Sequence, residues 1–123
     1  MSPSPKKTLL ALMDEWPDSW AGSANDKPFG AGLVAEMRPF VVHLDTLGLT
    51  RRTVRHHLDN LWAIGGEIIR RLYDEPALRK KTPRTVLLDA IDLGEAPLVY
   101  GACEEKQRGF DATARKLLRF LTA

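Results

Sequence analysis

The residues best suited to chemistry cluster at the start of one predicted helix. Arg51, Arg52 and Arg55 fall within five consecutive positions. His56 and His57 follow directly and would add charge below about pH 6.5. A helix N-terminus attracts anions through its free amides and its dipole, so this cluster predicts a phosphate-binding surface. The alternative is that the arginines only solvate a polar helix face.

Other reactive side chains do not form a catalytic or metal-binding pattern. Adjacent histidines on a helix point about 100° apart, so His56 and His57 cannot face one metal ion together, and His43 belongs to another predicted helix. Cys103, the only cysteine, stands alone near a helix start, where a structural role is more common than a nucleophilic one. The sequence therefore predicts no catalytic residue, no metal, no cofactor and no enzymatic activity.

One long helix must position the arginine cluster. Gly48 predicts the end of the helix before it, and Thr50 is a suitable N-cap. The helix is expected to run from about Arg51 to Tyr73 and to form the centre of the fold. Its apolar residues recur at spacings of three, four and seven, which places them on one helix face. They are Val54, Leu58, Leu61, Trp62, Ile68, Ile69 and Leu72.

Two glycines interrupt this helix. Gly65 lies eleven residues after Val54, on the predicted buried face. Glycine within a helix costs about 1 kcal/mol relative to alanine, so a compensating reason is expected. One interpretation is that another helix crosses here and needs the space of the missing side chain. The other is a hinge at Gly65 and Gly66.

The chain before the long helix divides into two parts. Ser4 and Pro5 suit the start of a short helix that buries Leu9, Leu10, Met13 and Trp16, and Pro17 is expected to end it. Residues 17–32 are dense in turn formers and predict a long connection. Residues 1–32 are thus expected to form an N-terminal arm, and residues 33–123 a helical bundle. In the bundle, Leu33, Met37, Phe40, Val41, Leu44 and Leu47 predict a helix that Pro39 kinks or breaks near Arg38.

After the long helix, short helices are expected at residues 76–81 and 83–92, and a last one from about Cys103 to Leu121. Residues 93–101 contain Pro97 and two glycines, so we expect an extended segment with residues 98–100 against the core. No alternating strand pattern occurs. The predicted class is all-α: a small helical bundle around one central helix.

Composition limits the class of function. The 123 residues are 44% hydrophobic, as expected of one compact domain. The formal net charge is only +2, so nucleic-acid binding would have to come from local clustering. The N-terminus lacks an apolar signal core, and no apolar run approaches the roughly 20 residues that span a bilayer. We therefore expect a soluble, cytoplasmic protein with no membrane partner.

The residues around the predicted turn resemble two protein families. Residues 40–61 resemble the opening of the core-binding, SAM-like N-terminal domain of tyrosine recombinases and phage integrases. There an aromatic-led helix ends at a glycine, and a Thr-Val pair, here Thr53-Val54, starts a long second helix. Residues 48–61 are similar to the recognition helix of LuxR-type helix-turn-helix domains. The integrase-like resemblance also accounts for the length of the helix, and it implies a DNA-binding module of bacterial or mobile-element type.

The chain departs from a complete recombinase. That family needs a separate catalytic domain with several basic residues and a tyrosine nucleophile, for which residues 76–123 are too few. Neither Tyr73 nor Tyr100 has an arginine-histidine signature around it. The predicted function is therefore non-catalytic contact with duplex phosphates through four residues: Arg51, Arg52, Arg55 and His56.

A helical adaptor or homodimer with no nucleic-acid role is the alternative. Trp16 and Trp20, in the N-terminal third, would suit an arm that docks on a partner protein. A contiguous basic patch on the folded surface would favour DNA, whereas an apolar patch under the arm would favour protein.

Overall fold

A computed structural model describes residues 5–123, with side chains from residue 9 onward, so the proposed cap Ser4 lies outside the described residues. All regular structure in this range is helical, which confirms the all-α prediction. The α-helices are α1 (Pro5–Leu12), α2 (Trp16–Trp20), α3 (Lys27–Thr46), α4 (Arg51–Asp74), α5 (Pro83–Ile91) and α6 (Glu104–Thr122). Short 3₁₀ segments are η1 (Met13–Glu15), η2 (Ala24–Asp26) and η3 (Pro76–Lys80).

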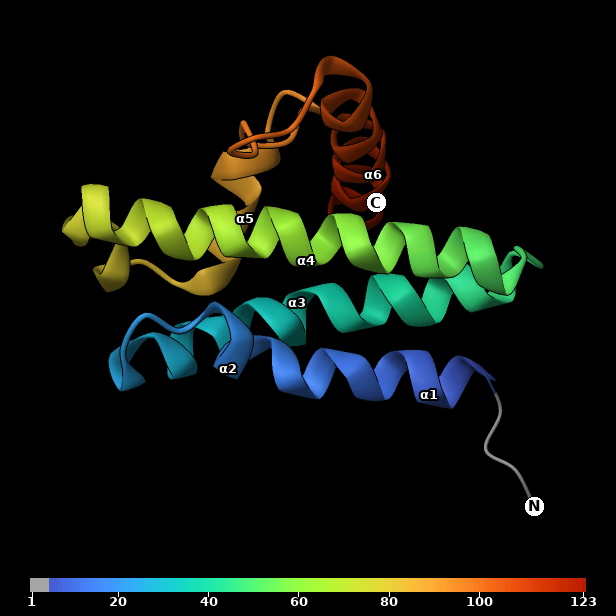
Figure 1. Ribbon diagram of the computed structural model, residues 1–123, viewed down its shortest axis with the longest axis horizontal. Helices are drawn as coiled ribbons and strands as arrows, with labels where there is room; N and C mark the ends of the chain where they lie inside the picture. Colours follow the sequence, from blue (N-terminus) through green and yellow to red (C-terminus); the bar gives the residue numbers. More distant parts are fainter. Residues whose placement is uncertain (1–4) are drawn as a thin grey trace.

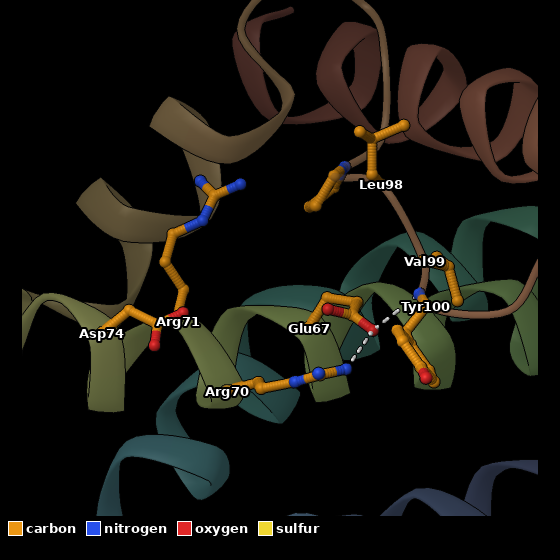
Figure 2. A pocket seen from close by; sticks show the side chains of 8 residues that line it. Glu67, Arg70, Arg71, Asp74, Leu98, Val99 and Tyr100 are labelled. Atoms are coloured by element: carbon orange, nitrogen blue, oxygen red, sulfur yellow. Dashed lines mark hydrogen bonds and ion pairs between the residues drawn. The ribbon is translucent and has the colours of Figure 1, made fainter.

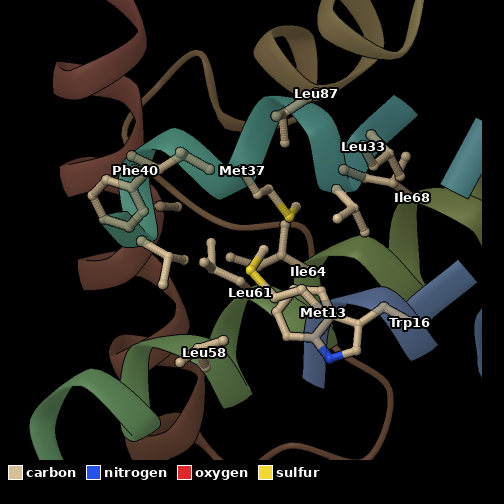
Figure 3. Close-up of a cluster of buried hydrophobic side chains, with 14 of the residues drawn as sticks. Met13, Trp16, Leu33, Met37, Phe40, Leu58, Leu61, Ile64, Ile68 and Leu87 are labelled. Atoms are coloured by element: carbon tan, nitrogen blue, oxygen red, sulfur yellow. The ribbon is translucent and has the colours of Figure 1, made fainter. Parts of the chain in front are cut away.

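α1, α3 and α4 lie lengthwise beside one another and alternate in direction (Figure 1). α1 and α2 run along α3, α4 returns antiparallel to α3, and α6 stands across α4. Figure 3 shows apolar side chains from these elements meeting in one core. Met13, Met37 and Ile64 are completely buried there. The core therefore joins the N-terminal segment to the rest of the bundle.

α4 is the predicted central helix. Thr50 Oγ1 accepts a hydrogen bond from Thr53 N–H at 3.2 Å, as expected of an N-cap, and Gly48 adopts a φ of 70°. The buried face also matches, apart from Trp62, which is 46% exposed. His57 and Ile64 complete that face instead, because both lie on the side of α4 that meets the core.

The expected loop over residues 17–32 is wrong. Pro17 and Pro28 each lie in the first turn of a helix, where a proline costs no hydrogen bond, so neither ends one. α3 begins at Lys27, and residue 32 therefore lies inside it. The side chains of the N-terminal segment are part of the common core, with Leu9, Met13, Trp16 and Trp20 buried.

α3 also continues through Pro39, so the predicted break near Arg38 does not occur. Leu47, expected on the buried face of this helix, lies just beyond its end and is 54% exposed. No helix among the described residues 5–123 is long and apolar enough to cross a bilayer.

Gly65 leaves space for the indole of Trp20. A Cβ atom at Gly65 would lie 2.3 Å from Trp20 Cζ2, well inside van der Waals contact. The Trp20 indole N–H also donates to the carbonyl oxygen of Trp62 at 2.9 Å. The packing interpretation of Gly65 is confirmed, with the correction that a tryptophan side chain of α2 occupies the space.

Residues 93–101 are non-helical, as predicted, but the expected burial is wrong. Leu98 and Tyr100 are 84% and 83% exposed, and Pro97 is the residue that turns inward. The extended backbone alternates its side chains, so burying Pro97 directs its neighbour Leu98 outward.

Candidate nucleic-acid interface

The four predicted contact residues all lie exposed in the first two turns of α4. The helix start is well formed, because Thr50 caps it and the turn before it is short. Among the described residues, Arg51 and Arg52 form no ion pair or side-chain hydrogen bond. Two guanidinium groups therefore stand free at a helix N-terminus, where the dipole also favours an anion.

Arg55, unlike Arg51 and Arg52, has an ion-pair partner. Its Nε lies 3.0 Å from Asp59 Oδ1, one helical turn further along α4. Both side chains are largely exposed, so the ion pair is weak, but the carboxylate still offsets part of the arginine charge. Arg55 is expected to contribute less to anion binding than Arg51 or Arg52.

His57 does not add charge, contrary to the sequence-based expectation. It is buried, and its Nδ1 lies 2.8 Å from Thr113 Oγ1 on α6. Asn60 Nδ2 donates to the same hydroxyl at 2.9 Å, so the two residues of α4 hold α6 in place. Burial, the largest cause, and the nearby charges of Lys116 and His56 together lower the pKa of His57 to about 4. His57 is therefore neutral at pH 7.

The fold brings a further cation to the start of α4. Lys116, on α6, is exposed and its Nζ lies 3.5 Å from His57 Nε2. At this distance its positive charge raises the electrostatic potential at His57 and lowers the pKa of that ring. Sequence reasoning missed this contact because 59 positions separate the two residues. In the sequence, Lys116 appears only as a basic residue near the end of a predicted helix.

The arginines are presented at the end of a helical hairpin. α3 has 20 residues and α4 has 24, and the two lie side by side in opposite directions (Figure 1). The helices of a helix-turn-helix cross at about 90–120° instead. The exposed arginines thus lie where the hairpin turns, at one end of the molecule.

Apolar surface is also exposed near this region, on both sides of Trp62. A groove of about 750 Å³ lies between α4 and α6, with Trp62 and Phe110 in its lining. A hollow of about 250 Å³ lies between Trp62 and Leu12 of the N-terminal segment. The Trp62 indole N–H donates to Ser19 Oγ at 2.9 Å, which fixes the ring between the two.

The cysteine and the histidines are the remaining candidates for chemistry. Cys103 is exposed and lines the same groove as His56. Within residues 5–123, no group of three or more histidine, cysteine or acidic side chains could hold a metal ion.

Comparison of the chain with protein-family models, curated proteins and solved structures finds no match. The integrase-like and LuxR-like resemblances therefore stay predictions.

Proposed function

We propose that the protein is a small, non-catalytic DNA-binding protein that contacts duplex phosphates through the start of α4. The observation that carries this proposal is the state of Arg51 and Arg52, which are exposed at a capped helix N-terminus without a partner among the described residues. Phosphate contacts from such groups release counterions, which is the main source of non-specific DNA affinity.

Three other arginines of the chain are already paired with carboxylates, which supports this surface over theirs. Arg38 pairs with Asp14, Arg79 with Asp26 and Arg84 with Glu36. A phosphate would have to compete with those carboxylates. Arg51 and Arg52 have no such competitor among the described residues, and Lys116 of α6 adds a cation to the same end of α4.

A salt-dependent gel shift with generic duplex DNA tests the proposal. The logarithm of the binding constant should fall with the logarithm of salt concentration, with a slope of about −0.9 per phosphate contact. Replacing both residues, Arg51→Ala with Arg52→Ala, should flatten the slope by about two units. Adding Arg55→Ala should change it by less than a further unit, because Asp59 already offsets that charge.

The matched control is the pair Lys80→Ala and Lys81→Ala, which removes the same net charge near the opposite end of α4. It should leave the slope unchanged. The proposal fails if the parent protein does not bind at about 50 mM salt, where phosphate contacts are favoured. It also fails if the arginine variants keep the parental slope.

A protein-binding adaptor or homodimer is the second candidate. The observation that favours it is Trp62, a rigidly held, half-exposed tryptophan between two hollows, one of which lies under the N-terminal segment. Aromatic side chains of this kind often anchor protein interfaces. Charges of both signs border these hollows, with Glu15, Asp59 and Glu105 beside Arg55 and Lys106, so the Trp62 surface lacks the uniformly positive character that phosphates favour.

A further inference from the structure

The most exposed large apolar side chains in residues 9–123 lie on the segment that joins α5 to α6. Leu93, Leu98 and Tyr100 are 82%, 84% and 83% exposed. Single exposed leucines are ordinary, but Leu98 and Tyr100 lie two positions apart beside a hollow. Their arrangement points to a surface that binds something.

Side chains of α4 and α6 hold this segment in one conformation. Its backbone makes four hydrogen bonds to them: Ala96 N–H to Asp111 Oδ1 (2.9 Å), Val99 N–H to Gln107 Oε1 (3.0 Å), Tyr100 N–H to Glu67 Oε1 (3.1 Å), and Pro97 O from Gln107 Nε2 (3.1 Å). Leu98 and Tyr100 are therefore presented on a fixed backbone, which reduces the entropy lost on binding.

A hollow of about 320 Å³ lies directly beside these side chains (Figure 2). Residues Pro97 to Tyr100 form one wall, and the second half of α4 forms the other. The Arg70 guanidinium lies 5.0 Å from the centre of the Tyr100 ring, so Tyr100 is held against α4. Leu98 makes no such contact and protrudes at the edge of the hollow.

The charges on this surface balance. The α4 wall carries Glu67 and Asp74 as well as Arg70 and Arg71. Glu67 and Arg70 approach each other to 3.7 Å. Arg71 and Asp74 form no ion pair with a described residue, and Figure 2 shows the Arg71 side chain reaching into the hollow. One cation and one anion without an ion pair among the described residues are thus left on the α4 wall, across the hollow from Leu98.

We propose that this surface binds a second copy of the chain across a two-fold axis. Leu98 of each copy would enter the hollow of the other, and Arg71 of one copy would face Asp74 of the other. A two-fold interface uses the same patch twice, so the patch must complement itself. This surface meets that condition because it carries a protruding apolar side chain, a hollow whose other wall offers the apolar Pro97 and Val99, and one charge of each sign without an ion pair among the described residues.

Sedimentation equilibrium of the whole chain over a range of concentrations tests self-association. The parent should show a reversible equilibrium between monomer and dimer. Leu98→Glu should weaken the dimer at least about 30-fold, the effect of removing a central anchor residue. The matched control is Leu47→Glu, which alters another exposed leucine in the turn between α3 and α4 and should leave the equilibrium unchanged.

A charge exchange tests the two-fold arrangement itself. Arg71→Glu alone and Asp74→Arg alone should each weaken the dimer, because each places like charges opposite one another. Combining both substitutions reverses both pairs and should restore association. Circular dichroism should show that all variants stay folded, since Leu98 and Asp74 are exposed and the Arg71 side chain has no ion pair with a described residue.

Three results would overturn the proposal. The first is a chain that stays monomeric at every concentration, including one that binds a different protein through Leu98. The second is a dimer that Leu98→Glu leaves intact. The third is a dimer in which the combined charge exchange fails to restore what the single substitutions remove.

Discussion

Arginines lie at both ends of α4, and their surroundings differ. At the start of the helix, Arg51 and Arg52 have no partner among the described residues. Towards its end, Arg70 stacks on a tyrosine ring, and Arg79 of the following η3 segment lies 2.9 Å from buried Asp26. Arg70 and Arg79 are therefore held by structural contacts, whereas Arg51 and Arg52, like Arg71 near the end of α4, have no ion pair among the described residues and stay available to a ligand. The deciding factor is whether the fold supplies a carboxylate or an aromatic ring as a partner.

Contacts to the buried carboxylate of Asp26 hold the region at the end of α4 in place. Burial alone would raise the pKa of this carboxyl group, but hydrogen bonds outweigh it and lower the pKa to about 2. The donors are Tyr73 and Arg79, together with the backbone N–H groups of Gly22 and Ser23. Asp26 thus joins the N-terminal segment to the end of α4 and to η3.

The largest expected effect comes from breaking this junction. Asp26→Ala should lower the free energy of unfolding by about 2–4 kcal/mol, because it removes the buried acceptor of Tyr73 and of the backbone N–H groups of Gly22 and Ser23. Chemical denaturation measures the loss. Asp18→Ala is the control, since Asp18 pairs with Lys27 on the surface and should cost less than about 1 kcal/mol. Equal losses in the two variants would mean that Asp26 does not join these elements.

The contribution of Asp26 should also depend on pH in a defined direction. Its folded pKa is about 2, below the ordinary value of 3.8, so the unfolded chain binds the proton first as the pH falls. The stabilisation is present above about pH 4 and should be lost between there and about pH 2.

A smaller effect on stability tests how Trp20 of the N-terminal segment packs against the middle of α4. Gly65→Ala should destabilise the protein by about 1–3 kcal/mol, because the new Cβ would overlap the Trp20 indole. Gly66→Ala is the control. Its Cβ would lie 3.4 Å from Trp20, and alanine favours the helix, so stability should be unchanged or rise by up to about 1 kcal/mol. Thermal unfolding of both variants measures the difference, and equal behaviour would contradict the packing described for Trp20.

Local signals predicted the α4 half of the fold well. The helix start at Arg51 followed from Gly48 and Thr50, whose effects act within a few residues along the chain. The prediction for the N-terminal third was wrong because its prolines lie in the first turns of helices and its glycines allow close packing, so they do not form turns. Gly32, for example, lies inside α3, where a Cβ would lie 2.4 Å from Pro83 Cγ. A glycine that allows close packing looks the same in a sequence as one that makes a turn.

The site was predictable only in part for a related reason. Periodicity placed Arg51 and Arg52 on an exposed helix start, and the structure agrees. The contacts that distinguish His56 from His57, and that bring Lys116 to α4, depend on how α6 crosses that helix. No spacing along the chain encodes that crossing. The exposure of Leu98 was missed similarly, because the sequence does not show that the core is already filled.

The smallest expected effect measures the electrostatic potential at the start of α4 through His57. Lys116→Gln removes one of the charges that lower the pKa of His57, so that pKa should rise from about 4. It should stay below the ordinary value of 6.5, because burial, the largest cause, remains. NMR titration of the His57 ring measures the shift. Arg108→Gln is the control, as it removes an exposed charge elsewhere on α6.

The pH dependence of the free energy of unfolding measures the same electrostatic potential at His57 independently. Folded His57 binds its proton near pH 4 and the unfolded chain binds it near pH 6.5, so the free energy of unfolding should fall as the pH drops between these values. Lys116→Gln should reduce that fall by less than about 1 kcal/mol, since Lys116 is exposed and its charge is screened by water. An unchanged His57 pKa would mean that Lys116 adds no potential here. Lys116 would then take no part in phosphate binding, and Lys116→Gln should leave the salt slope of DNA binding as it is in the parent.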